Sequence, residues 1–263
     1  MTVTATHAPG TFCWVDLSAH DAAAAKRFYP ALLGWSVNDM KYGEAEHEVY
    51  TMYEVDGRQV AASAAMGEDQ KGMGVPPFWL SYVAVENADE TAARAAELGG
   101  TVMAGPFDVL DAGRMAIVQD PTGAVFALWQ AGRHQGAGLL GQPGALCWNE
   151  LGTADPARAR DFYTSLFGWG AQEMETVAPY TMFAQGEQMV GGMYQLSPDM
   201  QMPPCWLPYF AVDDADATAE RVRELGGQVL MGPEDIPGIG RFVLIQDPQG
   251  AFFYVIKLAQ SGS

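Results

Sequence analysis

The feature that most constrains the fold is an internal repeat, because residues 14–35 recur as residues 148–169. Both stretches read as a short apolar strand, a turn, and an amphipathic helix that ends at a glycine. The matching residues are all separated by 134 positions, and they are Trp14 and Trp148, Asp21 and Asp155, Phe28-Tyr29 and Phe162-Tyr163, Leu32 and Leu166, and Gly34-Trp35 and Gly168-Trp169. A gap-free match of this length indicates duplication, so we expect two similar domains.

Hydrophobic periodicity predicts that each domain contains two modules with the order strand, helix and three strands. Asp21 is the expected N-cap of the first helix, and Gly34 is its expected end. The Gly- and Pro-rich residues 67–77 are expected to connect the first two modules. We therefore predict an α+β fold with two tandem domains, residues 10–131 and 144–258, joined by a glycine-rich linker at residues 132–143.

Composition excludes several classes of function. A net charge of −18 with only 14 Lys and Arg argues against nucleic-acid binding, because no basic patch can be assembled. No apolar run approaches the roughly 18 residues of a membrane span, and Met1–Pro9 has no secretory pattern. Cys13, Cys147 and Cys205 lie in apolar runs without a metal-binding spacing, which predicts buried, reduced thiols and a cytoplasmic protein.

A second shared motif is a hairpin of the form Gly-Arg…Asp-Pro-x-Gly, which occurs at residues 113–123 and 240–250. Together with the Asp-capped helix that closes on Phe-Tyr-x-x-Leu-x-Gly-Trp, it resembles the vicinal oxygen chelate family of glyoxalases, bleomycin-resistance proteins and ring-cleaving dioxygenases. The resemblance extends over residues 10–258 in two copies. It implies that each domain pairs two β-α-β-β-β modules into a half-open mixed-sheet barrel around a cavity. Tandem copies with a first-strand Trp resemble actinobacterial glyoxalase-like proteins and accessory or resistance proteins of antibiotic pathways.

Metal-dependent members of this family hold the ion with His, Gln or Glu on four cavity-facing strands. The resemblance carries three of these positions onto Trp14 and Trp148, Leu80 and Leu207, and Ala127 and Tyr254, while the fourth lies within residues 61–65 or 190–194. Trp, Leu and Ala do not coordinate divalent ions, and the two short runs contain no usual ligand. We therefore expect no bound metal and no cofactor.

Strand alternation assigns side chains to the two expected cavities. They are Trp14, Asp16, Tyr82, Val125 and Trp129 in the first domain, and Trp148, Glu150, Tyr209, Phe252, Tyr254 and Ile256 in the second. Aromatic side chains in place of charged ligands suit a planar, largely apolar molecule, with one acid to fix its orientation. The alternative is that the aromatic side chains fill the cavities, so that no ligand binds there.

Glu150 is the candidate catalytic residue, since a carboxylate among aromatic side chains can act as a general base or accept a hydrogen bond from a ligand. Asp16 is its shorter counterpart. The alternative is that each acid pairs with an arginine of a neighbouring strand, for which Arg114 and Arg241 are the expected partners.

The sequence favours a metal-independent small-molecule-binding protein that holds a planar aromatic metabolite or antibiotic. Its role would be sequestration, resistance or assistance to a biosynthetic pathway enzyme, and duplication within one chain favours a monomer. The second hypothesis is an enzyme, either a glyoxalase-like lyase or dioxygenase, or a metal-free isomerase or cyclase that uses Glu150 as base. No phosphate-binding loop and no nucleophile–base pair is present in the sequence.

Overall fold

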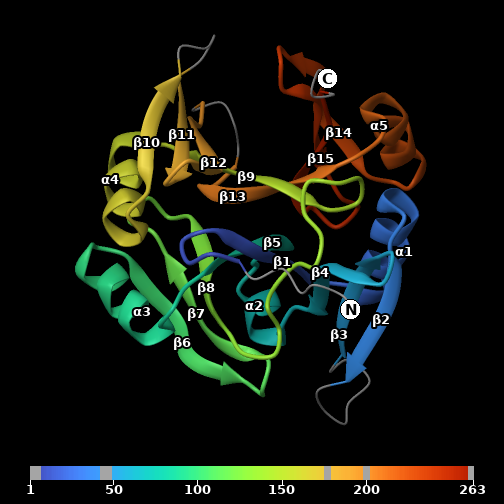
Figure 1. Cartoon of the computed structure of the whole chain (residues 1–263). Coiled ribbons are helices and arrows are strands. Elements are labelled where there is room, and N and C mark those ends of the chain that lie inside the picture. Colours follow the sequence, from blue (N-terminus) through green and yellow to red (C-terminus); the bar gives the residue numbers. More distant parts are fainter. Residues whose placement is uncertain (1–6, 42–48, 175–178, 198–201, 260–263) are drawn as a thin grey trace. The chain divides into compact units, whose positions relative to one another are not determined.

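The computed structural model describes residues 7–41, 49–174, 179–197 and 202–259. Within these residues the chain is α+β, with sixteen strands and five helices (Figure 1). The order strand, helix, three strands occurs four times, as the sequence predicts. None of the helices in this described part combines the length and apolarity that crossing a bilayer requires.

The elements of the first repeat are, in chain order, β1 (Phe12–Ala19), α1 (Ala22–Leu33), β2 (Ser36–Lys41), β3 (Val49–Val55), β4 (Arg58–Ala65), α2 (Glu68–Gly72), β5 (Phe78–Ala84), α3 (Ala88–Glu97), β6 (Thr101–Val109), β7 (Gly113–Gln119) and β8 (Val125–Ala131). Those of the second repeat are β9 (Leu146–Thr153), α4 (Pro156–Phe167), β10 (Gly170–Met174), β11 (Tyr180–Gln185), β12 (Gln188–Gln195), β13 (Cys205–Ala211), α5 (Ala215–Glu224), β14 (Gln228–Ile236), β15 (Gly240–Gln246) and β16 (Phe252–Leu258).

The caps of the repeated helices confirm the local prediction. The Asp21 side chain accepts a hydrogen bond from the backbone N–H of Ala24 at 2.9 Å, and α1 ends at Gly34 with φ of 72°. Asp155 and Gly168 do the same for α4, where the glycine again has φ of 72°. A glycine suits this left-handed position because it has no Cβ. The short helix α2 lies in the predicted connector and was not expected.

Each repeat forms one open, mixed eight-stranded sheet. The strand orders are β2-β3-β4-β1-β5-β8-β7-β6 and β10-β11-β12-β9-β13-β16-β15-β14. The pairs β1/β4, β5/β8, β9/β12 and β13/β16 are parallel, because in each module the helix and two further strands intervene between them. The remaining neighbours within each module are antiparallel hairpins. This is the arrangement that the repeated modules predict.

Packing divides the chain into two compact units that interleave the repeats. Unit 1 contains the described residues up to 14, together with residues 80–136 and 148–207. Unit 2 contains residues 15–79 and 137–147 and the described residues from 208 onward. Each unit therefore combines one module of the first repeat with one module of the second, and each has its own hydrophobic core.

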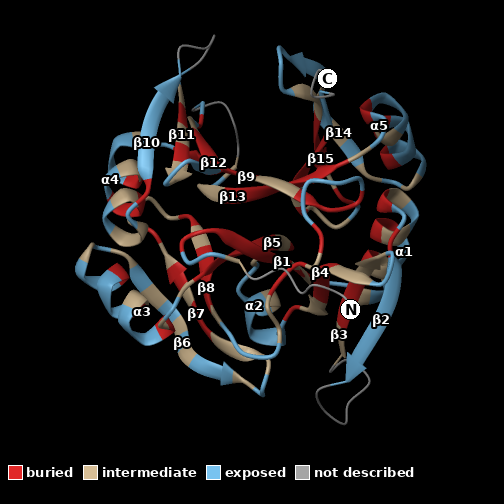
Figure 2. Ribbon diagram, in the orientation of Figure 1, coloured by how far each residue is buried: buried red, intermediate tan, exposed pale blue. Residues whose placement is uncertain are grey.

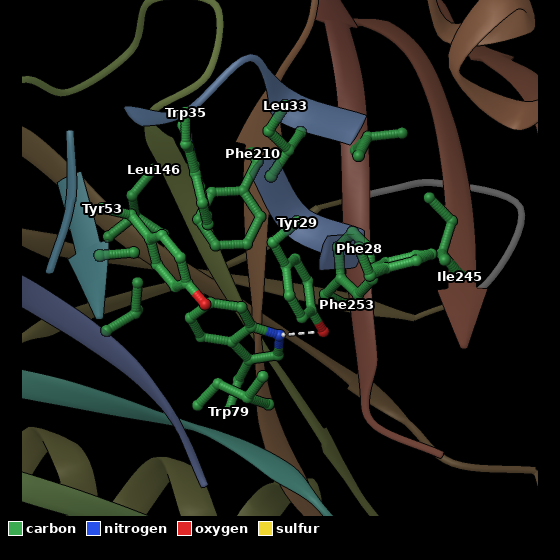
Figure 3. Close-up of a cluster of buried hydrophobic side chains, with 14 of the residues drawn as sticks. Phe28, Tyr29, Leu33, Trp35, Tyr53, Trp79, Leu146, Phe210, Ile245 and Phe253 are labelled. Atoms are coloured by element: carbon green, nitrogen blue, oxygen red, sulfur yellow. Dashed lines mark hydrogen bonds between the residues drawn. The ribbon is translucent and has the colours of Figure 1, made fainter. Parts of the chain in front are cut away.

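The core of unit 2 joins aromatic side chains from both repeats (Figure 3). Trp35 stacks on Tyr53 with ring centroids 4.8 Å apart. The indole N–H of Trp79 donates to the Tyr29 hydroxyl at 3.1 Å, and that hydroxyl donates to Asp247 Oδ2 at 2.9 Å. Because Tyr29 belongs to the first repeat and Asp247 to the second, this buried polar chain links the two repeats inside one core.

The core of unit 1 contains the equivalent chain. Trp206 Nε1 donates to the Tyr163 hydroxyl at 2.7 Å, and Tyr163 donates to Asp120 Oδ2 at 2.8 Å. The other oxygen of Asp120 accepts hydrogen bonds from Thr122 and Ala124 in the β7–β8 turn. Burial raises the pKa of Tyr163, and the charge of Asp120 adds to that effect, so the phenol stays protonated.

In Figure 2 the buried residues follow the central strands of the sheets, and the exposed residues follow the outer strands and the helix surfaces.

Candidate functional site

The most connected group of predicted site residues lies in unit 1, on one face of β9. Trp148 and Glu150 alternate with Asn149 and Leu151, so the first two share a face. Leu151 belongs to the core on the other face. Tyr180, the first residue of β11, lies between the predicted residues: Trp148 Nε1 donates to its hydroxyl at 3.2 Å, and the hydroxyl donates to Glu150 Oε1 at 2.8 Å.

Strand β12 lies between β11, which carries Tyr180, and β9, which carries Glu150 (Figure 1). Gly192 of β12 lies opposite Glu150 in the parallel ladder and opposite Met182 in the antiparallel ladder. A Cβ placed on Gly192 would coincide with the Tyr180 hydroxyl and overlap its ring. The tyrosine hydroxyl therefore occupies the space that any other residue at position 192 would fill with its side chain.

Burial and charge keep the Tyr180 hydroxyl in its protonated form. Glu150 is 8% exposed, and Tyr180 is half-buried. Burial raises the pKa of Tyr180 well above its usual range, and the neighbouring charge of Glu150 raises it further. The hydroxyl is thus a hydrogen-bond donor to the carboxylate at neutral pH, while it accepts from the Trp148 indole.

The first repeat has a related pair in unit 2. The Tyr50 hydroxyl donates to Asp16 Oδ2 at 2.9 Å, and Asp16 lies opposite Ala62 of β4. Asp16 and Ala62 occupy the register positions of Glu150 and Gly192. Sequence reasoning missed both tyrosines. The signal that marks them is a repeated Tyr-Thr-Met triplet, at residues 50–52 and 180–182, whose spacing differs from that of the helices.

Three other predicted residues, Trp14, Tyr82 and Trp129, gather in unit 1 around a histidine. The His134 ring meets the edge of Trp14 at a centroid distance of 4.5 Å and lies 5.8 Å from Trp129, which in turn contacts Tyr82 at 6.2 Å. Burial, together with the charge of His7, lowers the pKa of His134 to about 4, so its imidazole is neutral at pH 7. His134 lies in the linker and has no repeat counterpart, so no sequence pattern pointed to it.

The remaining predicted aromatic residues lie in unit 2. Tyr209 and Tyr254 stack with ring centroids 4.1 Å apart and an interplanar angle of 11°. They are neighbours in the parallel β13/β16 ladder and are both buried. Phe252 lies two residues earlier on β16, on the face of Tyr254, and is half-buried. Strand alternation predicts these three side chains on one face of the sheet, and the positions of β13 and β16 agree with that.

Arg114 and Arg241, the expected partners of the two acids, bind other carboxylates. Arg114 donates to both carboxylate oxygens of Asp89, at 2.6 and 2.8 Å, and to Asp108. Arg241 binds Asp216 in the same bidentate way. These pairs connect β7 with the first turn of α3, and β15 with the first turn of α5, because the arginine side chains extend toward the helix N-termini.

The donors around Glu150 do not fit a divalent ion. Trp148 presents an N–H group and Tyr180 a protonated phenol, so Glu150 supplies the anionic oxygens of this group. Across the part of the chain that the structure describes, no group of three or more His, Cys, Asp and Glu side chains is arranged to hold a metal.

The cysteines are free thiols, and they are less uniformly buried than the sequence predicts. Cys13 is buried, whereas Cys147 and Cys205 are half-buried by exposed area. Desolvation raises the pKa of Cys147 and that of Cys205 to about 12 each. Cys147 Sγ donates to the Tyr209 carbonyl at 3.4 Å, and Cys13 Sγ makes the equivalent contact with the Tyr82 carbonyl at 3.5 Å. These thiols have the environment of structural residues.

Comparison with known proteins supports this fold and its duplication. The family described as "Glyoxalase/Bleomycin resistance protein/Dioxygenase superfamily" matches residues 11–128 and 146–254. A Mycobacterium tuberculosis protein, CFP32, which its name describes as a candidate glyoxylase, is 44% identical over 252 residues, covering 95% of each chain. The anthracycline biosynthesis protein DnrV of Streptomyces peucetius is 38% identical over 270 residues, covering 96% of this chain and 95% of its own.

Solved structures with much lower identity share the fold. The Mn(II)-bound glyoxalase of Novosphingobium aromaticivorans superposes with a TM-score of 0.65 at 15% identity, covering 95% of this chain and 82% of that one. The 2,3-dioxygenase LapB of Pseudomonas sp. KL28 also gives 0.65, at 11% identity and with 98% and 96% covered. With the duplicated modules and the family match over both repeats, the chain belongs to the glyoxalase/bleomycin resistance protein/dioxygenase superfamily.

Proposed function

We propose that this protein binds a planar aromatic small molecule without a metal ion and holds it for sequestration, resistance or an antibiotic pathway. The observation that carries this proposal is the hydrogen-bonded group of Trp148, Tyr180 and Glu150 on one sheet face. It combines an aromatic surface with a donor and an acid, which are the features that bind and orient a flat, partly polar ligand. The stacked Tyr209 and Tyr254 add a second aromatic surface of the same kind.

The names of two relatives support one class of ligand as the first to test. Two proteins named for anthracycline biosynthesis match almost the whole chain, DnrV at 38% identity and DauV of Streptomyces sp. at 37%. Anthracyclines are fused-ring quinones, so their flat rings suit an aromatic surface and their polar substituents suit Glu150. A hydroxylated anthraquinone is therefore the appropriate first probe. The free thiols support a reducing, cytoplasmic setting, and we further propose a monomer that serves a biosynthetic pathway enzyme.

Isothermal titration with 1,4-dihydroxyanthraquinone tests this proposal, since calorimetry does not depend on the tryptophans as fluorophores. The native chain should bind saturably, and Trp148→Ala should weaken binding about tenfold or more, because a buried aromatic contact is worth about 1.5 kcal/mol or more. Arg94→Ala is the matched control, because Arg94 is an exposed residue of α3 that pairs with Glu97. Equal affinity of Trp148→Ala and the native chain would reject the site.

The Tyr180 contact also supports an enzymatic alternative, a metal-free isomerase or cyclase. A carboxylate held by a phenol is oriented for proton transfer, and a positioned general base contributes about 10²–10⁴-fold to a rate. Glu150→Gln separates the two functions, because the amide keeps the size of the acid but cannot take a proton. Loss of turnover with binding retained would support catalysis, and unchanged turnover would reject Glu150 as base. The metal-dependent lyase and dioxygenase alternatives lack a fitting donor set among the described residues.

A further inference from the structure

We propose that the space over Gly192 is a hydroxyl-binding subsite for the ligand, and that the phenol of Tyr180 occupies it in the ligand-free chain. The hydroxyl subsite is defined by the Trp148 indole N–H, the Glu150 carboxylate and the bare backbone of Gly192. This inference deepens the proposed function by naming the group of the ligand that is recognised. It assigns the ligand to the phenols and hydroxyquinones.

The hydrogen-bond geometry defines what the hydroxyl subsite accepts. One hydroxyl oxygen lies 3.2 Å from a donor, Trp148 Nε1, and 2.8 Å from an acceptor, Glu150 Oε1. A group that binds there must accept one hydrogen bond and donate another, which a hydroxyl does and a ketone or an ether does not. A phenolate or a carboxylate is also excluded, because it would place a second negative charge beside Glu150.

The glycine supplies the space. A Cβ on Gly192 would coincide with the Tyr180 hydroxyl, so any substitution there fills the hydroxyl subsite. The glycine has an ordinary strand conformation, with no positive φ, so backbone geometry does not require it. The space that the hydroxyl needs therefore explains why position 192 is a glycine.

The first repeat differs in both the residue on the central strand and the acid. Its register position is held by Ala62, whose methyl group lies where Gly192 has none, and its acid is the shorter Asp16. Tyr50 still donates to Asp16 at 2.9 Å, which shows that the tyrosine–acid contact does not itself require a glycine. The combination of Gly192, Glu150 and the Trp148 donor is thus a feature of the second repeat.

Removing the tyrosine ring should open the hydroxyl subsite to free phenol. The Tyr180→Ala chain should bind 4-methylphenol, an analogue of the tyrosine side chain, about tenfold or more tighter than toluene, because only the phenol replaces the two hydrogen bonds. Adding Gly192→Ala to this variant should abolish that preference, since the new methyl group fills the space. The matched control Arg94→Ala removes an exposed side chain of α3 that pairs with Glu97, and it should show no such preference.

A second variant keeps the test decisive if Tyr180→Ala does not fold. Tyr180→Phe retains the ring but loses both hydrogen bonds, so a ligand hydroxyl should displace it more easily. The affinity for 2-naphthol should rise about tenfold relative to the native chain, whereas that for naphthalene should change much less. Calorimetry measures the affinities, and the indole N–H resonance of Trp148 reports whether its hydrogen bond is restored.

Three results would overturn the hydroxyl subsite. They are equal binding of 4-methylphenol and toluene to Tyr180→Ala, an unchanged preference after Gly192→Ala is added, and weaker binding of 2-naphthol to Tyr180→Phe than to the native chain. The last result would mean that the Tyr180 hydroxyl contacts the bound ligand and does not take the place of a ligand hydroxyl. If the three results occur while anthraquinone binding still depends on Trp148, the subsite fails and the proposed function stands. If the phenol binds Tyr180→Ala but no planar aromatic binds the native chain, the subsite stands and the proposed function fails.

Discussion

Replacing Tyr163 by phenylalanine tests the buried polar chain of unit 1. Tyr163 is fully buried, donates to Asp120 at 2.8 Å and accepts from Trp206 at 2.7 Å. The variant keeps the ring but loses a hydrogen bond to a charged group, worth about 1.5–3 kcal/mol, and leaves the Trp206 N–H without its acceptor, at a cost of about 1–3 kcal/mol. We expect the free energy of unfolding to fall by about 3–5 kcal/mol.

The matched control is Tyr53→Phe, because Tyr53 is equally buried and its hydroxyl shares a hydrogen bond of 2.7 Å with the neutral Ser63 hydroxyl. A neutral hydroxyl pair contributes about 1 kcal/mol, so this variant should lose that amount. Urea unfolding followed by far-UV circular dichroism measures both. With an m-value of about 3 kcal/mol/M, Tyr163→Phe should lower the midpoint by about 1 to 1.7 M. Equal losses in the two variants would refute the reasoning that the carboxylate and the indole make the difference.

Three further predictions follow from burial and from the interleaved cores. Residues 1–136 and 137–263 produced separately should each lack cooperative thermal unfolding, and mixing them should restore it, because each core needs both repeats; cooperative unfolding of either fragment would contradict this. The pKa of His134 is lowered to about 4, below its unfolded value of about 6.5, so the unfolded chain binds more protons between these values and stability should fall by up to about 3 kcal/mol as pH drops through that range. His134→Gln should flatten this pH dependence in urea titrations, and an unchanged slope would exclude His134 as its source. The three thiols should alkylate with iodoacetamide at pH 8 at least about 100-fold more slowly in the folded chain than in urea, because burial raises their pKa values; mass spectrometry gives the rates, and equal rates would contradict the burial.

The elements of this fold were predictable because their signals are local. An aspartate cap, an apolar stripe and a terminal glycine specify α1 and α4 within about a dozen residues each, and the duplication doubles every signal. The interleaving of the repeats was not predictable in this way. It depends on which aromatic side chains meet in a core, such as Tyr29 with Asp247, and no pattern within one repeat contains that pairing.

The candidate site was predicted in part, for a related reason. Alternation along β9 correctly assigned Trp148 and Glu150 to one face, since the period of a strand depends only on its own residues. Tyr180 was missed because its role depends on three strands at once. It lies on β11, crosses β12 where Gly192 has no side chain, and contacts β9. Periodicity describes one strand at a time and carries no information about a residue that reaches over its neighbour.

The interleaving of the repeats also limits how this chain can exchange parts with its relatives. Recombination at the linker, residues 132–143, would join the first repeat of one protein to the second repeat of another. If each repeat formed its own globular body, such a crossover would leave both bodies intact, but here it would place a foreign module in both cores at once. The Trp–Tyr–Asp chains would then have to match across the junction, since each draws its tyrosine from one repeat and its aspartate from the other. A crossover at the linker therefore keeps both cores intact only when the two parent proteins have compatible residues at these positions.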